Sequence, residues 1–169
     1  MAGVRITTAL DTSGARRTLG YMRNLAEDPA PLLDILGNTL LVNTEARFDT
    51  ERGPGGIPWP RSQRAIKQGG RTLFDKGLLY DSLRYEVRPG QVEVGVDGAS
   101  ESAKFAYVQQ FGATIVPRNA KVLAFTGADG HLVFAHSVTI PARPFLGIDE
   151  TDRDDVDENW RSYVVGLLG

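Results

Sequence analysis

The sequence contains no cysteine among its 169 residues, which excludes disulfides, thiolate metal sites and cysteine nucleophiles. No apolar run approaches the length of a membrane span and the N-terminus has no signal-peptide core, so we expect no membrane contact. A formal net charge of -2 argues against a protein whose main task is to grip phosphates. The hydrophobic share of 41% is that of an ordinary globular protein, and the length fits a single domain spanning residues 1–169.

Residues for chemistry are equally scarce. The histidines His131 and His136 fall on opposite faces of a strand-like run and lack a metal-ligand pattern around them. The acidic run 149–158 lacks the central glycine of a calcium loop, and the glycines at 53, 55 and 56 do not lead into a lysine-bearing helix. The serines lack a nucleophile-elbow setting. We therefore expect no catalytic residue, no metal and no cofactor, and we do not expect an enzyme.

Helical patterns occupy both ends of the chain. Asp11, Thr12 and Ser13 can cap a helix that runs to about Ala26. Pro31 suits the first turn of a second helix that runs to about Thr50, and its apolar stripe is broad enough to predict burial on two sides. Three further helices are predicted, over Leu73 to Leu83, over Glu101 to Phe111 with Gly112 as the stop, and after a cap at Thr151 or Asp152, with an acidic first turn.

Alternating patterns predict antiparallel hairpins. The clearest joins Arg84 to Arg88 with the valines at 92, 94 and 96 across a turn at Pro89-Gly90. A second hairpin joins Val122 to Phe125 with His131 to Ile140, and Val4 to Leu10 and Thr114 to Val116 add shorter strands. Because helices and hairpins are segregated, the sequence predicts an α+β fold, with an antiparallel sheet of hairpins packed against long helices.

Two connecting segments carry the remaining signals. The run from Arg52 to Pro60 is too rich in glycine and proline for a helix or an inner strand, so we expect a loop pinned by Trp59. The basic segment Arg61 to Arg71 follows it. Its cations form either a solvated face or a phosphate contact, and the second possibility makes a non-enzymatic DNA-binding module the alternative function.

The stretch Ile140 to Gly147 is the one around which the chain is organised. Its prolines at 141 and 144 stiffen the backbone without hydrogen-bonded structure, and Phe145 with Leu146 supplies a large apolar anchor. One interpretation is a rigid strand-to-helix connection plugged into the core. The other is a stiff corner that presents Arg143 to a partner. Composition leaves both open.

Four segments together resemble the phage virion morphogenesis family, the Mu-type tail-completion and neck proteins. They are Phe48 with Pro54 to Trp59, Leu73 to Leu83, Phe105 to Gly112, and Pro141 to Gly147. The order and spacing of these segments, over roughly residues 30 to 168, carry the resemblance. One departure is that Phe105-Ala106-Tyr107 replaces the simpler Tyr-Ala pair of the family, which affects the register of that helix.

This resemblance implies a structural protein of a tailed bacteriophage or prophage. Such a protein forms a homo-oligomeric ring, of six copies by the resemblance, that completes the tail and meets the tail tube protein and the head connector or stopper. Genome DNA passes through the lumen without sequence specificity. The expected location is the head-tail junction of the virion, with the host cytoplasm during assembly. A near-neutral to acidic charge suits this role, because a basic lumen would retard passing phosphates.

The resemblance also implies interface or structural roles for particular residues. Trp59 and Ile57 would pin their loop into the subunit's own core or into a neighbour. Arg143 would make a charge-assisted contact near a subunit boundary, with a carboxylate such as Asp75 or Asp81. The hairpin Val122 to Phe134 and the loop Arg52 to Arg71 are expected to face partners. The complete set is Phe48, Ile57, Trp59, Gly77, Phe111, Gly112, Pro141, Arg143, Pro144 and Phe145.

Overall fold

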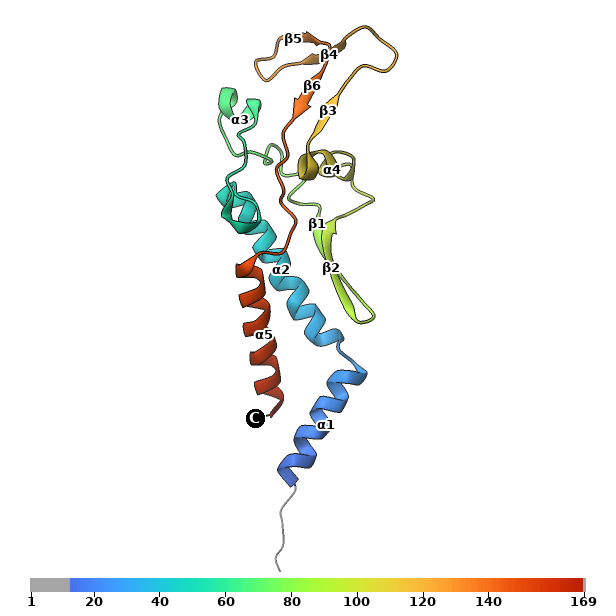
Figure 1. Ribbon diagram of the computed structural model, residues 1–169, viewed down its shortest axis with the longest axis vertical. Helices are drawn as coiled ribbons and strands as arrows, with labels where there is room; N and C mark the ends of the chain where they lie inside the picture. Colours follow the sequence, from blue (N-terminus) through green and yellow to red (C-terminus); the bar gives the residue numbers. More distant parts are fainter. Residues whose placement is uncertain (1–12, 169) are drawn as a thin grey trace, which may run out of the picture.

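The computed structural model describes residues 13–168, and the protein is elongated (Figure 1). Three long helices gather toward one end with one antiparallel strand pair beside them, and two further short antiparallel pairs lie toward the other end. The helices are α1 (Ser13–Glu27), α2 (Ala30–Thr50), α3 (Gln63–Gln68), α4 (Ala103–Phe111) and α5 (Glu150–Leu168), with a 3-10 turn at Pro54–Gly56. The strands are β1 (Leu83–Arg88), β2 (Gln91–Val96), β3 (Ala113–Ile115), β4 (Leu123–Thr126), β5 (Leu132–Ala135) and β6 (Val138–Ile140). The predicted α+β class is confirmed.

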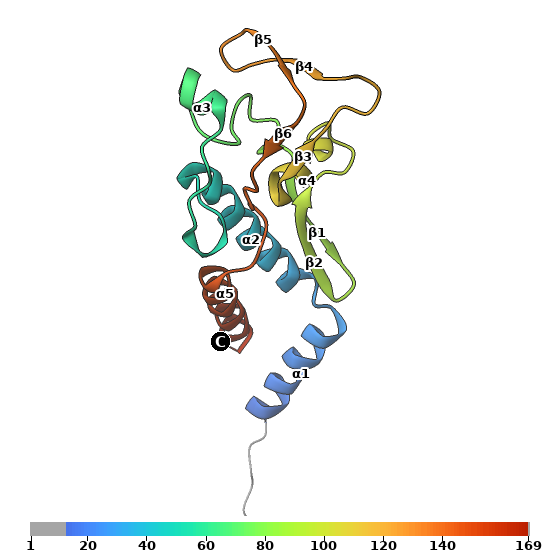
Figure 2. The same cartoon turned by 45° about the horizontal axis from the view of Figure 1, so that its top comes forward.

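Helix α2 lies at the centre of the lower part of the molecule (Figure 2). It packs against the β1–β2 hairpin and against α5, so the predicted burial on two sides is confirmed. The expected covers were the helix's own sheet and a neighbouring subunit, and α5 of the same chain provides the second cover instead. The hairpin approaches closely at Gly37, where an added Cβ would lie 2.4 Å from Cδ2 of Tyr85. The hydroxyl group of Tyr85 also donates to Asp34 Oδ1 at 2.8 Å. An alanine at position 37 would therefore push the hairpin off the helix.

The strands form three separate pairs instead of one sheet. β1 pairs with β2 across the predicted Pro89-Gly90 turn, with Tyr85 opposite Val94. The predicted continuous strand His131 to Ile140 is broken at residues 136–137. Its first part, β5, pairs with β4, and its second part, β6, pairs with β3. The strand breaks where its pairing partner changes from β4 to β3. The alternation of apolar residues gives no sign of this change.

The predicted helix from Leu73 to Leu83 is wrong. The segment consists of successive turns, and Leu73 and Gly77 have φ values of 62° and 80°. A right-handed helix cannot continue through positive φ. The amide N–H of Asp81 donates to Gly77 O at 2.8 Å, and Ser82 Oγ donates to Leu79 O at 2.7 Å. The segment buries Leu79 and Leu83 without forming a helix, and Leu78 stays exposed.

Two smaller differences concern the ends of the chain. The predicted strand Val4 to Leu10 and the cap residues Asp11 and Thr12 lie outside the described residues. The last helix begins at Glu150, ahead of the start expected from a cap at Thr151 or Asp152. None of the helices within residues 13–168 is long and apolar enough to span a membrane.

The hydrophobic core is small and centred on Phe48, which is fully buried at the C-terminal end of α2. Its ring lies 5.4 Å from that of Trp59, 5.8 Å from Tyr80 and 5.6 Å from Phe145, between ring centroids. Edge-to-face contacts of this kind add to the stabilisation that comes from burial alone. The buried members of the cluster are Phe48, Trp59, Leu79, Leu83, Ala106 and Phe145. All four segments that carried the family resemblance thus contribute to one core.

Candidate functional site

Residues 141–149, here called the strap, connect β6 to α5 without regular secondary structure. The strap passes close to α4 and then along the C-terminal end of α2 before it enters α5 (Figures 1 and 2). The backbone N–H and C=O groups of the strap have no neighbouring strand to pair with. Where these groups are buried, they need hydrogen bonds from elsewhere. Side chains supply these hydrogen bonds. They come from α2, from α4 and from the loop Arg52 to Pro60, here called the Gly/Pro loop.

Two adjacent glutamines of α4 bind the first half of the strap. Gln110 Oε1 accepts from the amides of Phe145 and Leu146, both at 3.0 Å, and Gln110 Nε2 donates to Leu146 O at 2.8 Å. The backbone carbonyl of Gln109 accepts from the amide of Arg143 at 2.7 Å. Gln110 therefore acts as a substitute for a neighbouring strand. The sequence motif Gln109-Gln110 gave no signal of this role.

Gly112 allows this close approach. It ends α4 with a φ of 73°, as its predicted role as a helix stop requires. An added Cβ would lie 2.8 Å from the amide nitrogen of Ala142 and 3.0 Å from Ile140 O. Any side chain at position 112 would therefore separate α4 from the strap.

Arg47 of α2 binds the second half of the strap. Its Nη1 donates to Phe145 O at 3.1 Å and to Gly147 O at 3.0 Å. Its Nη2 forms a buried ion pair with Asp152 of α5, and Asp149 Oδ2 lies 3.6 Å away. One guanidinium thus joins α2, the strap and α5. Sequence analysis missed Arg47, although a lone cation on a broadly apolar helix, next to Phe48, was a usable signal.

The Gly/Pro loop is fixed to the strap by Trp59. The indole Nε1 donates to Pro144 O at 2.8 Å, and the ring packs on Phe48, so Trp59 pins the loop into the subunit's own core. An added Cβ on Gly53 would lie 2.5 Å from the same carbonyl oxygen. Ile57 is different, because 68% of it is exposed. It contributes little to pinning the loop within the subunit, and its contact with a neighbour stays a prediction.

The start of α5 is capped by a reciprocal pair of aspartates. Asp149 Oδ1 accepts from the amide of Asp152 at 3.1 Å, and Asp152 Oδ2 accepts from the amide of Asp149 at 2.9 Å. The N-cap is therefore Asp149, and the expectation that Thr151 or Asp152 is the cap is wrong. Each carboxylate satisfies an amide that has no partner inside the helix. The cap also holds the end of the strap in place.

The pKa of Asp149 gives the cap a pH dependence. The hydrogen bond from the amide of Gly55, at 2.8 Å, is the main cause that lowers the pKa of Asp149 below its usual 3.8, assisted by the Asp152 amide and Arg47. The stabilisation is present above the unfolded-state pKa and is lost as pH falls through the lower folded-state value. We expect Asp149→Asn to lower the free energy of unfolding by about 1 kcal/mol at pH 7. This difference should begin to shrink near the unfolded-state pKa of about 4 and should close as pH falls through the lower folded-state pKa.

Urea titrations of both proteins at several pH values would measure this gap. Asp154→Asn is the matched control, because Asp154 is an exposed carboxylate of the same helix. If the difference in the free energy of unfolding between wild type and Asp149→Asn stays constant from pH 7 to pH 3, the charge of the Asp149 carboxylate is not its cause.

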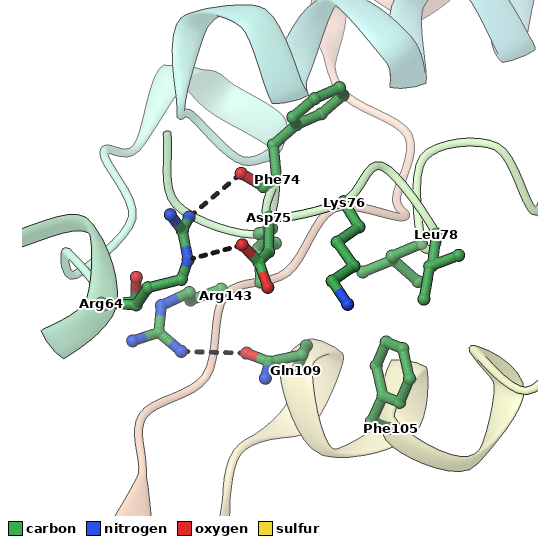
Figure 3. A pocket seen from close by; sticks show the side chains of 11 residues that line it. Arg64, Phe74, Asp75, Lys76, Leu78, Phe105, Gln109 and Arg143 are labelled. Atoms are coloured by element: carbon green, nitrogen blue, oxygen red, sulfur yellow. Dashed lines mark hydrogen bonds and ion pairs between the residues drawn. The ribbon is translucent and has the colours of Figure 1, made fainter. Parts of the chain in front are cut away.

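Arg143 is buried, with 5% of its surface exposed, beside a pocket of about 370 Å³ (Figure 3). Its Nε donates to Pro60 O at 2.7 Å and its Nη1 donates to Gln109 Oε1 at 2.9 Å. Within the subunit it does not pair with Asp75 or Asp81 as expected, and Asp75 instead lies 3.7 Å from Arg64. Burial lowers the pKa of Arg143 from its usual value. The guanidinium joins the Gly/Pro loop to α4.

The same pocket is lined by charged, polar and apolar side chains from several segments of the chain. Figure 3 shows Arg64 and Asp75 on one side, and Gln109 and Phe105 of α4 on the other. Ser62 accepts a hydrogen bond from the Ala65 amide as the cap of α3, so its hydroxyl group serves the backbone. Among the described residues, no group of three or more His, Asp or Glu side chains could hold a metal ion. The arrangement connects segments of the chain to one another.

The basic segment 61–71 is largely occupied within the subunit. Arg64 donates to the carbonyl oxygens of Gly69, Arg71 and Phe74. Arg71 forms an ion pair with Asp49 and lies over the Phe74 ring, and Lys67 Nζ lies 2.7 Å from Asp129 Oδ2 in the β4–β5 turn. Arg61 donates to two backbone carbonyls. The arginines thus hold this end of the protein together.

The remaining site residues divide into buried and exposed groups. Phe48 and Phe145 are buried, while Pro141 and Pro144 keep exposed rings on the strap. Gly77 provides a turn with positive φ. Phe111 is 64% exposed and lies 4.8 Å from the ring of Tyr107, between centroids, on the outer face of α4. The structure therefore brings Phe48, Trp59 and Phe145 together in one core and leaves Phe111 and Ile57 on the surface.

Comparison with known proteins gives one result. A family model described as the phage virion morphogenesis family matches residues 10–165. Neither the curated proteins nor the solved structures that were compared give a match. The matched range includes α1, the core around Phe48, the strap and most of α5. Because the match covers nearly the whole chain, this protein belongs to the phage virion morphogenesis family.

Proposed function

We propose that this protein forms a ring at the head-tail junction of a tailed phage, where it completes the tail and joins it to the head connector. Its membership of the family gives it a structural role in phage morphogenesis and associates it with the virion. The proposal goes beyond this family role in four points: the ring, its place at the head-tail junction, the passage of DNA through its lumen, and a count of six copies. The observation that carries the proposal is the amount of surface that the isolated chain leaves exposed.

The accessible surface of the chain is 11892 Å². A compact monomer of 18.4 kDa exposes about 8,200 Å². Even with about 1,900 Å² set aside as the largest area that residues 1–12 can contribute, an excess of roughly 1,800 Å² remains. In a ring each copy loses the area of one complete interface, and stable interfaces of standard size bury about 1,200–2,000 Å². The excess is therefore of the size that ring closure would remove.

Exposed apolar side chains support the same conclusion. The β4–β5 hairpin is apolar on both faces, with Phe125 and Val133 paired on one face and Leu132 and Phe134 on the other. Leu132 and Phe134 are largely exposed, as are Tyr107 and Phe111 of α4. An isolated two-stranded hairpin is marginally stable in water, and large exposed apolar patches mark interaction sites. The hairpin, predicted from sequence to face a partner, is thus a surface for neighbouring copies or for the tail.

DNA binding through the basic segment 61–71 is less well supported. Its arginines already donate to backbone carbonyls and its ion pairs involve Asp49, Asp75 and Asp129. Binding phosphates there would require these contacts to be exchanged. The near-neutral charge of the whole chain agrees with a passive lumen for DNA better than with a DNA-binding surface.

The native mass of the purified protein tests the proposal, first alone and then in the presence of tail tubes. We expect a closed species of about six copies, either free in solution or formed on the tube end. Leu132→Asp combined with Phe134→Asp should reduce tail-joined particles while circular dichroism stays unchanged, because both residues are exposed. Val42→Asp, at an exposed position on α2, is the control. A wild-type monomer under both conditions would overturn the proposal.

A further inference from the structure

Arg143 is a buried cation that has no opposite charge beside it. The residue is 5% exposed, and its guanidinium donates to neutral oxygens, the backbone carbonyl of Pro60 and the side-chain carbonyl of Gln109. Among the described residues, no carboxylate forms an ion pair with it, and Asp75 pairs with Arg64 instead. A buried charge is costly unless an opposite charge compensates it. The isolated subunit therefore keeps an uncompensated positive charge at this position.

One nitrogen of the same guanidinium is available to a ligand. Nε and Nη1 of Arg143 each donate a hydrogen bond, whereas Nη2 has no partner within residues 13–168. In that part of the chain, the buried side-chain nitrogen or oxygen atom without a partner is Thr72 Oγ1, so Arg143 Nη2 keeps contact with solvent. A guanidinium presents its donors in a fixed plane that suits a carboxylate. Arg143 can therefore bind an anionic group that enters from outside.

The pocket beside Arg143 combines positive charge with apolar surface (Figure 3). Its volume of about 370 Å³ lies in the range of small-ligand sites. The charged residues that line it are three cations and one carboxylate, namely Arg64, Lys76, Arg143 and Asp75. Leu78 and Phe105 also line it, and they are 56% and 39% exposed. The lining thus fits an anion that has apolar groups next to it.

We propose that this pocket binds a carboxylate that a partner protein presents between apolar residues. The carboxylate neutralises Arg143, accepts from its Nη2 and is attracted by the exposed Lys76, while the apolar neighbours cover Leu78 and Phe105. A phosphate of duplex DNA fits less well, because a duplex is too wide to enter the pocket and reach a guanidinium that is 5% exposed. The inference stands on the pocket and on Arg143, and it does not require the ring.

Calorimetric titration of the full-length protein with an acetylated and amidated Leu-Asp-Leu peptide tests the site. This peptide carries a single carboxylate between two apolar side chains, and its blocked ends are uncharged. The matched Leu-Asn-Leu peptide has nearly the same shape without the charge. We expect it to bind at least about ten times more weakly, because hydrogen bonds to charged groups are the stronger ones. Dimethyl phosphate, which represents the DNA backbone, should also bind more weakly than the aspartate peptide.

Variants of the protein locate the binding in this pocket. Lys76→Glu should keep the fold, because Lys76 is exposed, and should weaken binding of the aspartate peptide at least about tenfold by replacing attraction with repulsion. Lys121→Glu is the matched control and should leave binding unchanged, because Lys121 is an exposed residue between β3 and β4 that does not line the pocket. Arg143→Lys should also weaken binding, because a lysine cannot reproduce the planar donors. If that variant does not fold, Lys76→Glu still tests the site.

Three results would overturn the inference: equal binding of the aspartate and asparagine peptides, tighter binding of dimethyl phosphate, or equal effects of Lys76→Glu and Lys121→Glu. The native mass of the same samples separates this inference from the proposed function. A ring that does not bind the peptide, and whose mass Lys76→Glu leaves unchanged, overturns the carboxylate site alone. If Lys76→Glu instead releases monomers from that ring, the partner that supplies the carboxylate is a second copy. A protein that binds the peptide but stays monomeric, alone and with tail tubes, retains the site and overturns the ring.

Discussion

Replacing Arg47 by methionine is expected to lower the free energy of unfolding by about 3–5 kcal/mol, because it leaves a buried charge without its partner. Asp152 is 2% exposed, and Arg47 is its ion-pair partner. Without Arg47, the Asp152 carboxylate keeps only the amide of Asp149 and the side-chain amide of Asn43, at 2.9 and 3.1 Å. The carbonyls of Phe145 and Gly147 lose their donor at the same time.

Denaturation with urea, followed by far-UV circular dichroism, would measure this loss. Arg23→Met is the matched control, because Arg23 forms an exposed pair with Glu27 at 3.6 Å, and we expect a change below about 1 kcal/mol. If Arg47→Met does not fold, the double variant Arg47→Met/Asp152→Asn provides the measurement. It removes the unpaired charge and should be more stable than Arg47→Met alone. Equal effects of Arg47→Met and Arg23→Met would contradict the role assigned to Arg47.

The local patterns of the sequence were sufficient for most elements of the fold. The stripe from Leu33 to Phe48 predicted α2 and its burial on two sides, and alternation around Pro89-Gly90 predicted the β1–β2 hairpin. Each pattern extends over many consecutive residues. A single residue with an unusual backbone conformation therefore leaves the pattern recognisable. The same features made the family resemblance visible, since its segments carry the core residues Phe48, Trp59 and Phe145.

Contacts between distant segments were not predictable in this way. Leu73 to Leu83 has helical spacing, but positive φ at Leu73 and Gly77 turns the chain so that Leu79 and Leu83 reach the core. Arg47 and Asp152 are 105 residues apart, and each alone resembles an ordinary helix charge. The partner of the Trp59 indole is a backbone carbonyl 85 residues away, which leaves no trace in the residue type. These contacts depend on the path of the chain.

Residues 140–147 had two interpretations, a rigid connection plugged into the core and a stiff corner that presents Arg143 to a partner. The contacts of the strap decide between them for the single subunit. Its polar backbone groups are bound by Gln110, Arg47 and Trp59, and Phe145 fills the centre of the core with 1% of its surface exposed. Arg143 is buried beside Gln109. The strap is therefore a rigid connection plugged into the core.

Two phenylalanines separate folding from assembly in one experiment. Phe145→Ala removes a buried ring that packs on Phe48, and we expect it to lower the free energy of unfolding by about 3–5 kcal/mol. Phe111→Ala removes a ring that is 64% exposed, so we expect a change in stability below about 1 kcal/mol. If the outer face of α4 contacts a partner, Phe111→Ala should instead reduce tail-joined particles, because exposed aromatic residues are frequent anchors of interfaces.

Thermal or urea unfolding of the two variants, together with a count of joined particles by electron microscopy, measures both effects. Tyr107→Phe keeps the ring next to Phe111 and should change neither quantity. Phe145→Ala is expected to reduce particles only in proportion to the fraction of folded protein, and osmolytes that favour the folded state should restore them. Phe111→Ala should not respond to osmolytes, because its defect lies in the contact between proteins. Loss of stability in Phe111→Ala as large as that in Phe145→Ala would show that the α4 face belongs to the core and that assembly uses other surfaces.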